Sequence, residues 1–292
     1  MKILITGGGG QLAEAFSKNL QSLNKYDFRI FSRKEMDITD YQKSLECIKD
    51  FSPDIIINTA AYTKVDDAES FRDEAFSVNK YGALNIATIC NKFDIPLIHF
   101  STDYVFDGKN KNPYSEEDTT NPINIYGLSK LEGENSITEA LKKYLIIRIS
   151  WVFSENGNNF LSSIIKLADS KDSLKVVSDQ IGNPTSTNEV SKVVIEILPK
   201  INDNWGVYHL VQSPSSTWSD FARNILDAAY EENLINNKVT VKNIKSIEYP
   251  AKARRPSNSR MLTSKIQNTF NLKLNSWESS LKQIIKNKKN AI

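Results

Sequence analysis

Apolar runs alternate with amphipathic stretches through the first half of the chain. The runs predict buried parallel strands, because strands covered on both faces lack a polar alternation; they span residues 2–6, 28–31, 55–57, 96–100 and 144–149. Helical periodicity follows the first four runs, over residues 11–23, 41–51, 72–93 and a stretch ending near 142. This order predicts an α/β fold with a Rossmann-like, doubly wound parallel sheet.

The pattern becomes less regular after Trp151. Short helices are expected at 160–167, 188–198 and 216–230, strands at 174–177 and 206–210, and a loop at 179–185. We interpret residues 151–292 mainly as a smaller C-terminal α/β substrate-binding lobe over the carboxyl edge of the sheet. Residues 1–150 are then the dinucleotide-binding domain, with additional elements from about 187–212.

Composition excludes several classes of protein. Hydrophobic residues make up 40% of the chain, and no apolar run approaches the roughly 20 residues that span a bilayer. The net charge is +2 and the lysines are scattered, so neither a nucleic acid nor a membrane is an expected partner. With no targeting segment recognised before the first strand, we expect a cytoplasmic protein, either a monomer or a homodimer.

Cysteine and histidine are too sparse for most metal sites. Cys47 and Cys90 lie in predicted helices without partner spacing and are expected to be reduced. His99 and His209 both lie inside strand-like runs, where a core or edge histidine is the simpler interpretation. No metal site is therefore predicted.

A glycine-rich turn joins the first strand to the first helix. Gly7 permits the tight turn, and Gly10 lets the backbone approach a pyrophosphate at the helix N-terminus, beside Gln11 and Leu12. Ala13 occupies the third small position of the dinucleotide fingerprint. The motif is weak alone, but its strand–turn–helix context favours a nicotinamide dinucleotide.

The end of the second strand indicates which dinucleotide is bound. NAD-binding chains usually carry an acid there, whereas this chain has Ser32 and Arg33. A hydroxyl and a guanidinium suit a 2′-phosphate, so NADPH is favoured, with NADH possible. Asp37 and Ile38 are expected at the edge of the adenine.

Small residues follow the third strand, where a flat ligand could lie close to the backbone. The remaining expected cofactor contacts are Thr59, Ala60, Ala61, Tyr62, Ser101 and, orienting the site from behind, Asn79.

A proton-transfer arrangement follows the fourth strand. Thr102 ends that strand, and Tyr126 and Lys130 lie one helical turn apart. A nearby ammonium lowers the pKa of a tyrosine, which suits proton donation to a developing alkoxide, and Thr102 could bind the same oxygen. About one Tyr-x-x-x-Lys is expected by chance, but Tyr126 is the only tyrosine of the chain with lysine at this spacing. Its position after the fourth strand indicates carbonyl reduction, with Tyr126 and Lys130 also contacting the cofactor.

These motifs together resemble the dTDP-4-dehydrorhamnose reductase family of the extended short-chain dehydrogenase/reductases. The matching stretches are Thr6-Gly7-x-x-Gly10-Gln11-Leu12, Asp37-Ile38-Thr39-Asp40, Asn58-Thr59-Ala60-Ala61-Tyr62-Thr63-x-Val65-Asp66, Ser101-Thr102-Asp103-Tyr104-Val105-Phe106-Asp107-Gly108, Tyr126-Gly127-x-x-Lys130, Arg148-x-Ser150-Trp151-Val152, Asp179-Gln180-x-Gly182-x-Pro184-Thr185 and Arg255-Pro256-x-Asn258-Ser259.

The resemblance implies NADPH-dependent reduction of the 4-keto group of a nucleotide-linked 6-deoxysugar, dTDP-4-dehydrorhamnose, to dTDP-rhamnose. It implies catalytic roles for Thr102, Tyr126 and Lys130. It also implies substrate contacts from Val65, Thr102, Asp103, Tyr104, Tyr126, Trp151 and Arg255. Some members bind a metal between subunits, but the matching positions here are Ala15 and Asn188, which argues against that metal.

Two other functions fit parts of the same pattern. An NAD-dependent sugar-nucleotide epimerase or dehydratase shares the fold, but dehydratases usually place Glu after the Thr-Asp pair, where this chain has Tyr104. A non-enzymatic regulatory subunit, like that of methionine adenosyltransferase, has similar motifs. An intact Thr102, Tyr126 and Lys130 does not exclude the second alternative.

Overall fold

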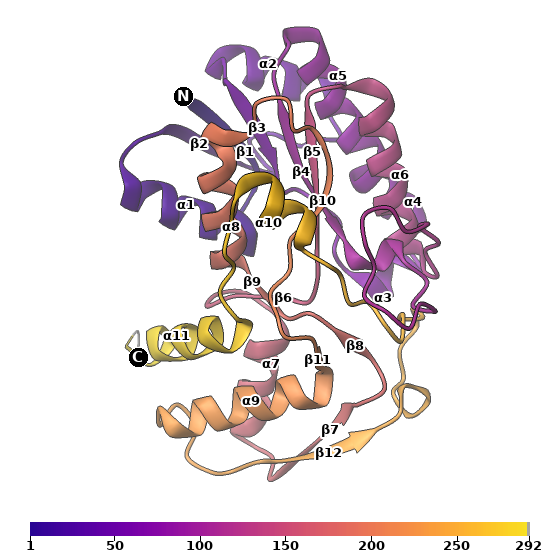
Figure 1. Cartoon of the computed structure of the whole chain (residues 1–292), viewed down its shortest axis with the longest axis vertical. Helices are drawn as coiled ribbons and strands as arrows, with labels where there is room; N and C mark the ends of the chain where they lie inside the picture. The colour runs from indigo at the N-terminus through magenta and orange to yellow at the C-terminus, as the bar shows by residue number, and fades with distance from the viewer. Residues whose placement is uncertain (291–292) are drawn as a thin grey trace.

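A six-stranded sheet, parallel throughout, forms the centre of the larger of two bodies in the computed structural model, which describes residues 1–290 (Figure 1). Its strand order is β10-β5-β4-β3-β1-β2. The strands are β1 (Lys2–Gly8), β2 (Asp27–Ser32), β3 (Ile55–Asn58), β4 (Leu97–Thr102), β5 (Tyr144–Ile149) and β10 (Gly206–His209). The predicted Rossmann-like sheet is confirmed.

Helices cover both faces of this sheet (Figure 1). One face packs against α1 (Gln11–Leu23), α8 (Thr187–Ile197) and α10 (Ser264–Phe270). The other packs against α2 (Tyr41–Phe51), α5 (Ala83–Phe93) and α6 (Ile125–Ala140). The inner strands β1, β3, β4 and β5 are buried on both faces over most of their length, which explains their continuous apolar runs, whereas the edge strand β2 is partly exposed.

The predicted helix at 72–93 is interrupted. It consists of α4 (Arg72–Phe76), a π-helical turn η1 (Ser77–Gly82) and α5. The wider turn contains Asn79, which is buried against α6. Single π turns inside α-helices often occur at functional sites, and sequence periodicity does not reveal them.

The smaller body has its own core. It is built by α7 (Phe160–Ala168), α9 (Trp218–Glu231) and α11 (Trp277–Asn290), with β7 (Ser173–Val177) paired in parallel to β12 (Thr240–Ile244). The prediction of a plain loop at 179–185 was wrong, because this segment contains β8 (Ile181–Gly182) and β9 (Thr185–Ser186). They pair with β11 (Ser216–Thr217) and β6 (Val152–Phe153), respectively. Two-residue strands leave no periodic signal.

The chain crosses between the two bodies more than once. After α7 and β7 it returns to the large sheet with α8 and β10, and after α9 it returns with α10. Short helices complete the path: α3 (Val65–Ala68), η2 (Asp103–Val105), η3 (Leu198–Lys200) and η4 (Ser246–Glu248). Across residues 1–290, no helix has the length and apolar character to cross a bilayer.

Candidate active site

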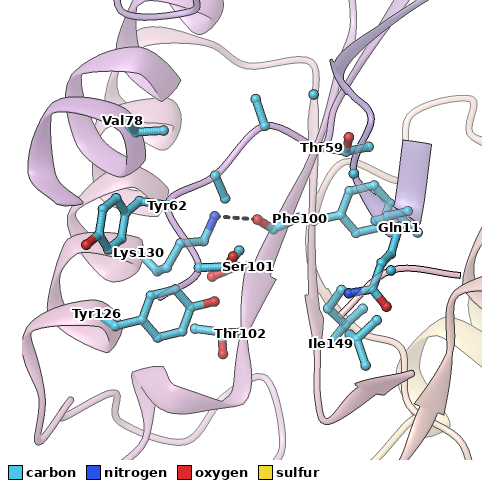
Figure 2. A pocket seen from close by; sticks show the side chains of 18 of the residues that line it. Gln11, Thr59, Tyr62, Val78, Phe100, Ser101, Thr102, Tyr126, Lys130 and Ile149 are labelled. Atoms are coloured by element: carbon cyan, nitrogen blue, oxygen red, sulfur yellow. Dashed lines mark hydrogen bonds between the residues drawn. The ribbon is translucent and has the colours of Figure 1, made fainter. Parts of the chain in front are cut away.

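A cavity of about 680 Å³ lies at the carboxyl ends of β1, β3, β4 and β5, where the two bodies meet. Carboxyl ends of parallel strands are the usual ligand site of doubly wound sheets. Figure 2 shows its lining side chains, which come from several elements separated in sequence. The lining includes all predicted site residues except Ser32, Asn79 and Arg255.

The glycine turn forms one end of the cavity. Gly7 has φ +76°, and a Cβ there would lie 2.7 Å from the backbone nitrogen of Ala60, so glycine is required twice over. Gly10 is the N-cap of α1 and brings no side chain to its first-turn N–H groups. These donors can therefore bind an anionic group, which fits the pyrophosphate of a dinucleotide.

Gln11 ties this turn to the smaller body. Its Oε1 accepts hydrogen bonds from Ser154 Oγ (2.6 Å) and Asn159 Nδ2 (2.9 Å), and its Nε2 donates to the Asn158 carbonyl (3.3 Å). Gly157, Asn158 and Asn159 consequently line the cavity. These three residues were not predicted from the sequence, where only the asparagine-rich composition of the loop could have suggested them.

The end of β2 carries a carboxylate after all. Ser32 donates from its backbone N–H (2.8 Å) and from Oγ (2.7 Å) to Glu35, and these bonds lower the pKa of Glu35. Arg33 lines the cavity and pairs with Asp37, with 3.0 Å between Nε and Oδ2. This acid was not predicted from the sequence, because Glu35 lies three residues past the strand and its side chain turns back to Ser32.

Asn79 lies behind the cavity wall. Its Oδ1 accepts from the Tyr62 N–H (2.8 Å), and its Nδ2 donates to the Tyr62 carbonyl (3.0 Å) and to Ser129 Oγ (2.9 Å). It therefore joins the segment after β3 to α6. Thr59 is fixed separately, by donation from Oγ1 to the Thr6 carbonyl at 2.6 Å.

Thr102, Tyr126 and Lys130 meet on one wall. Figure 2 shows the phenol of Tyr126 pointing toward Thr102, while the Lys130 chain extends to Phe100. Lys130 Nζ donates to the Phe100 carbonyl at 2.6 Å. The helix that carries both residues, α6, is capped by Asn124, whose side chain accepts from the Gly127 N–H at 2.7 Å.

The electrostatics differ from the sequence-based expectation. Burial raises the pKa of Tyr126 to about 12; a hydrogen bond with Thr102 acts against this, and the Asp103 charge adds to it. Burial also lowers the pKa of Lys130 to about 8, opposed by Glu134. The expected lowering of the Tyr126 pKa was wrong for this arrangement, because burial dominates and Lys130 Nζ is directed at the Phe100 carbonyl and not at the phenol.

Asp103, next to Thr102 on this wall, also has a shifted pKa. Burial raises its pKa to about 6, although hydrogen bonds from Ser259, Ser150 and Thr102 act in the opposite direction. Its two oxygens accept from Thr102 Oγ1 and Ser150 Oγ, each at 3.1 Å. The carboxyl group therefore orients the Thr102 hydroxyl next to Tyr126.

Two stacked indoles also line the cavity. Trp151 and Trp218 lie parallel, with 3.6 Å between ring centroids and 7° between planes, and both line the cavity. Trp151 was predicted as a site residue, whereas Trp218 was not, because it lies in no recognisable motif. Trp218 begins α9 directly after its cap Thr217.

Arg255 lies outside the cavity lining. Its guanidinium pairs with Asp66 at 2.7 Å, so it joins the smaller body to the segment after β3. Val65 and Tyr104 do line the cavity.

Ala15 and Asn188 face a separate cavity of about 480 Å³ between α1, α8 and α11. Among residues 1–290, no three histidine, cysteine, aspartate or glutamate side chains gather as a metal site.

Comparison with known proteins places this geometry in a family. A family model described as "RmlD substrate binding domain" matches residues 1–290. The chain is 39% identical over 287 residues to the dTDP-4-dehydrorhamnose reductase of Aggregatibacter actinomycetemcomitans, covering 97% of this chain and 98% of that protein. It is also 39% identical over 290 residues to the dTDP-4-dehydrorhamnose reductase of Sinorhizobium fredii, covering 98% and 97%.

Solved structures agree with this placement. The dTDP-4-dehydrorhamnose reductase of Bacillus anthracis, in complex with NADP, has a TM-score of 0.91 and 35% identity to this chain. The match covers 97% of this chain and 98% of that one.

Proposed function

The chain belongs to the dTDP-4-dehydrorhamnose reductase family, and we propose that it reduces dTDP-4-dehydrorhamnose to dTDP-rhamnose with NADPH. The observation that carries this proposal is the meeting of Thr102, Tyr126 and Lys130 on one wall of the cavity that the glycine turn closes. Fold alone would leave many reactions open. A hydroxyl, a phenol and an amine around one point suit the reduction of a carbonyl.

The cofactor is expected between the glycine turn, the end of β2 and the segment after β3. Its chemistry is to supply the hydride that reaches the carbonyl carbon. Gly7 and Gly10 would hold the pyrophosphate and Arg33 a 2′-phosphate, while Ala60 and Ala61 allow close approach.

The protein groups would manage the oxygen of the carbonyl. Thr102 donates its single hydroxyl proton to Asp103 at 3.1 Å in this structure, and it would turn that proton to the carbonyl oxygen when substrate binds. Tyr126 gives its phenolic proton to the same oxygen, so that the carbonyl becomes a hydroxyl and the phenol becomes a phenolate. Lys130, one turn further along α6 and also on the cavity wall, would then return a proton to the phenolate.

The sugar nucleotide is expected on the side of the smaller body. Val65, Tyr104 and the Trp151 indole line this side, and Trp218 backs Trp151. Arg255 would reach the diphosphate from the rim, where it is now paired with Asp66. We expect the enzyme to act in the cytoplasm as a monomer or a homodimer.

Turnover tests the proposal. Purified protein should oxidise NADPH when dTDP-4-dehydrorhamnose is added, and Tyr126→Phe should lower kcat by about 10²- to 10⁴-fold, because the proton donor is removed. Tyr230→Phe is the matched control, since Tyr230 is half-exposed on α9 outside the cavity. Full activity of Tyr126→Phe would refute the assignment of the proton donor.

The same assay separates the alternatives. Failure of the wild type to oxidise NADPH with dTDP-4-dehydrorhamnose or related keto sugars would refute the reductase and favour a regulatory subunit. Purification with stoichiometric bound NAD would favour an epimerase or dehydratase. Against the dehydratase stands Tyr104, which lines the cavity where such enzymes carry a glutamate.

A further inference from the structure

A chain of four buried side chains runs from the first strand to Lys130. Thr6 Oγ1 lies 2.6 Å from Asn58 Oδ1, Asn58 Nδ2 lies 3.0 Å from His99 Nδ1, and His99 Nε2 lies 3.3 Å from Lys130 Nζ. The four residues are between 0% and 2% exposed. They come from β1, β3, β4 and α6. This row of side chains therefore links the strand before the glycine turn to the Lys130 amine in the active site.

The proton positions along this row of hydrogen bonds can be assigned from its Thr6 end. The Ala60 N–H donates to both Asn58 Oδ1 (3.2 Å) and Thr6 Oγ1 (3.3 Å). If Asn58 Oδ1 faces Thr6, the Thr6 hydroxyl donates to it, and every group at this end has a partner. With the amide reversed, Asn58 Nδ2 would donate to Thr6, and the Thr6 hydroxyl proton would have no acceptor among the described contacts at this end.

The first orientation determines the state of His99. Asn58 Nδ2 then donates to His99 Nδ1, so the neutral ring carries its proton on Nε2. That N–H points at Lys130 Nζ. It can donate a hydrogen bond there only when the amine is neutral and has a lone pair to accept it. The neutral amine still donates to the Phe100 carbonyl at 2.6 Å, so His99 Nε2 and Lys130 Nζ each have a hydrogen-bond partner.

We propose that His99 is a positioning residue for Lys130: Asn58 holds it in the Nε2–H tautomer, and it donates to the amine and disfavours the ammonium. The amine therefore exchanges its proton close to neutral pH, as a group that resupplies Tyr126 must. The proposal rests on the proposed function only for the role of Lys130. The tautomer of His99 stands independently of any reaction.

The other groups around Lys130 agree with this assignment. Glu134, one turn along α6, favours the ammonium, but its carboxylate is already paired with Arg148 of β5 at 2.7 Å. From β4 the amine meets His99 and the Phe100 carbonyl, and from its own helix Tyr126 lines the same wall. Burial keeps the pKa of His99 well below its usual value, so the ring stays neutral through the active range.

The tautomer can be read directly. The chain contains only two histidines, so tag-free protein labelled with ¹⁵N-histidine gives two ring systems, and His209→Gln assigns them. At pH 7 we expect His99 to show a protonated Nε2 and an unprotonated Nδ1. A protonated Nδ1, or a doubly protonated ring, would overturn the proposal whether or not the protein turns over any substrate.

Asn58→Asp tests the coupling to Lys130. A carboxylate has the same shape, accepts from Thr6 and Ala60, and forces His99 to carry its proton on Nδ1, leaving Nε2 as an acceptor for the ammonium. We expect the NMR titration of ¹³C-labelled lysine, assigned with Lys130→Met, to move upward by about one pH unit or more. In the pH profile of kcat, the apparent pKa that depends on Lys130 should also shift upward.

His209→Gln is the matched control, because His209 is equally buried but contacts Arg148 (3.4 Å) and not Lys130. It should leave the Lys130 titration unchanged. An unchanged titration in folded Asn58→Asp would overturn the coupling. If Asn58→Asp fails to fold, the wild-type tautomer still decides the proposal.

Discussion

At the residue scale, cofactor preference depends on three side chains at the end of β2. Arg33 is exposed and faces both the cavity and the Asp37 carboxylate, 3.0 Å away. Ser32 is bound by Glu35 through two hydrogen bonds. A 2′-phosphate would therefore be recognised chiefly by Arg33, and Glu35 would repel it.

Replacing Arg33 should change the choice between cofactors. We expect Arg33→Ala to raise the KM for NADPH by about 10-fold, because a charge-assisted hydrogen bond contributes roughly 1.5–3 kcal/mol and this one is exposed. The KM for NADH should hardly change. Steady-state kinetics with both cofactors measure this.

Two variants serve as comparisons. Lys34→Ala removes a neighbouring charge outside the cavity lining and should have little effect on either KM. Glu35→Gln should lower the KM for NADPH, since it removes the opposing carboxylate. Equal losses for NADPH and NADH in Arg33→Ala would contradict the assignment.

At the scale of elements, the position of the catalytic groups depends on how closely α6 packs against η1 and η2. A Cβ at Gly127 would overlap the Tyr104 carbonyl oxygen, and one at Gly133 would overlap the Asn79 carbonyl oxygen. Both glycines therefore let α6 lie against η2 and η1. The same helix carries Tyr126 and Lys130, so its approach positions the catalytic groups.

Gly133→Ala should separate α6 from η1. Alanine gains up to about 1 kcal/mol in helix propensity, but the overlap with backbone costs typically 1–3 kcal/mol or more, so the clash outweighs the gain. We expect a net loss of stability of about 1–2 kcal/mol in urea unfolding, together with a lower kcat. Glu139→Ala, an exposed position on the same helix, is the control. Unchanged stability in Gly133→Ala would show that η1 can move without cost.

At the scale of the whole molecule, buried ionisable groups make stability depend on pH. Burial lowers the pKa of His209 to about 3, and that of His99 well below its usual value. Between these values and 6.5 the unfolded chain binds protons that the folded chain excludes. The contribution of the two neutral, buried histidines to the free energy of unfolding is therefore fully present above pH 6.5. It is lost as the pH falls below that value. Asp103, with its pKa raised to about 6, acts in the opposite direction between pH 6 and 3.8.

Acid should therefore destabilise the fold before most carboxylates titrate. We expect His209 alone to account for a loss of about 2–3 kcal/mol in the free energy of unfolding between pH 7.5 and 4.5. Urea unfolding at several pH values measures the slope. His209→Gln should flatten it by that amount, and an identical slope in this variant would refute the role of His209.

The sequence alone determined the order of the β-α units and the position of the chemistry along them. Local patterns carry this information: burial on both faces makes strands continuously apolar, and the glycine turn and the Tyr126–Lys130 spacing are local by nature. The interrupted helix at Ser77–Gly82 and the two-residue strands escaped detection, because neither changes the local periodicity.

Only the tertiary structure decided which distant residues complete the site. Trp218 joins Trp151, the loop at 157–159 closes on Gln11, and His99 meets Lys130 across a strand and a helix. It also decided that the Lys130 amine is directed to Phe100 and that the pKa of Tyr126 rises, because burial depends on what the whole chain packs around a group. Spacing placed the catalytic groups on one helix face, but their charge states depend on neighbours from other elements.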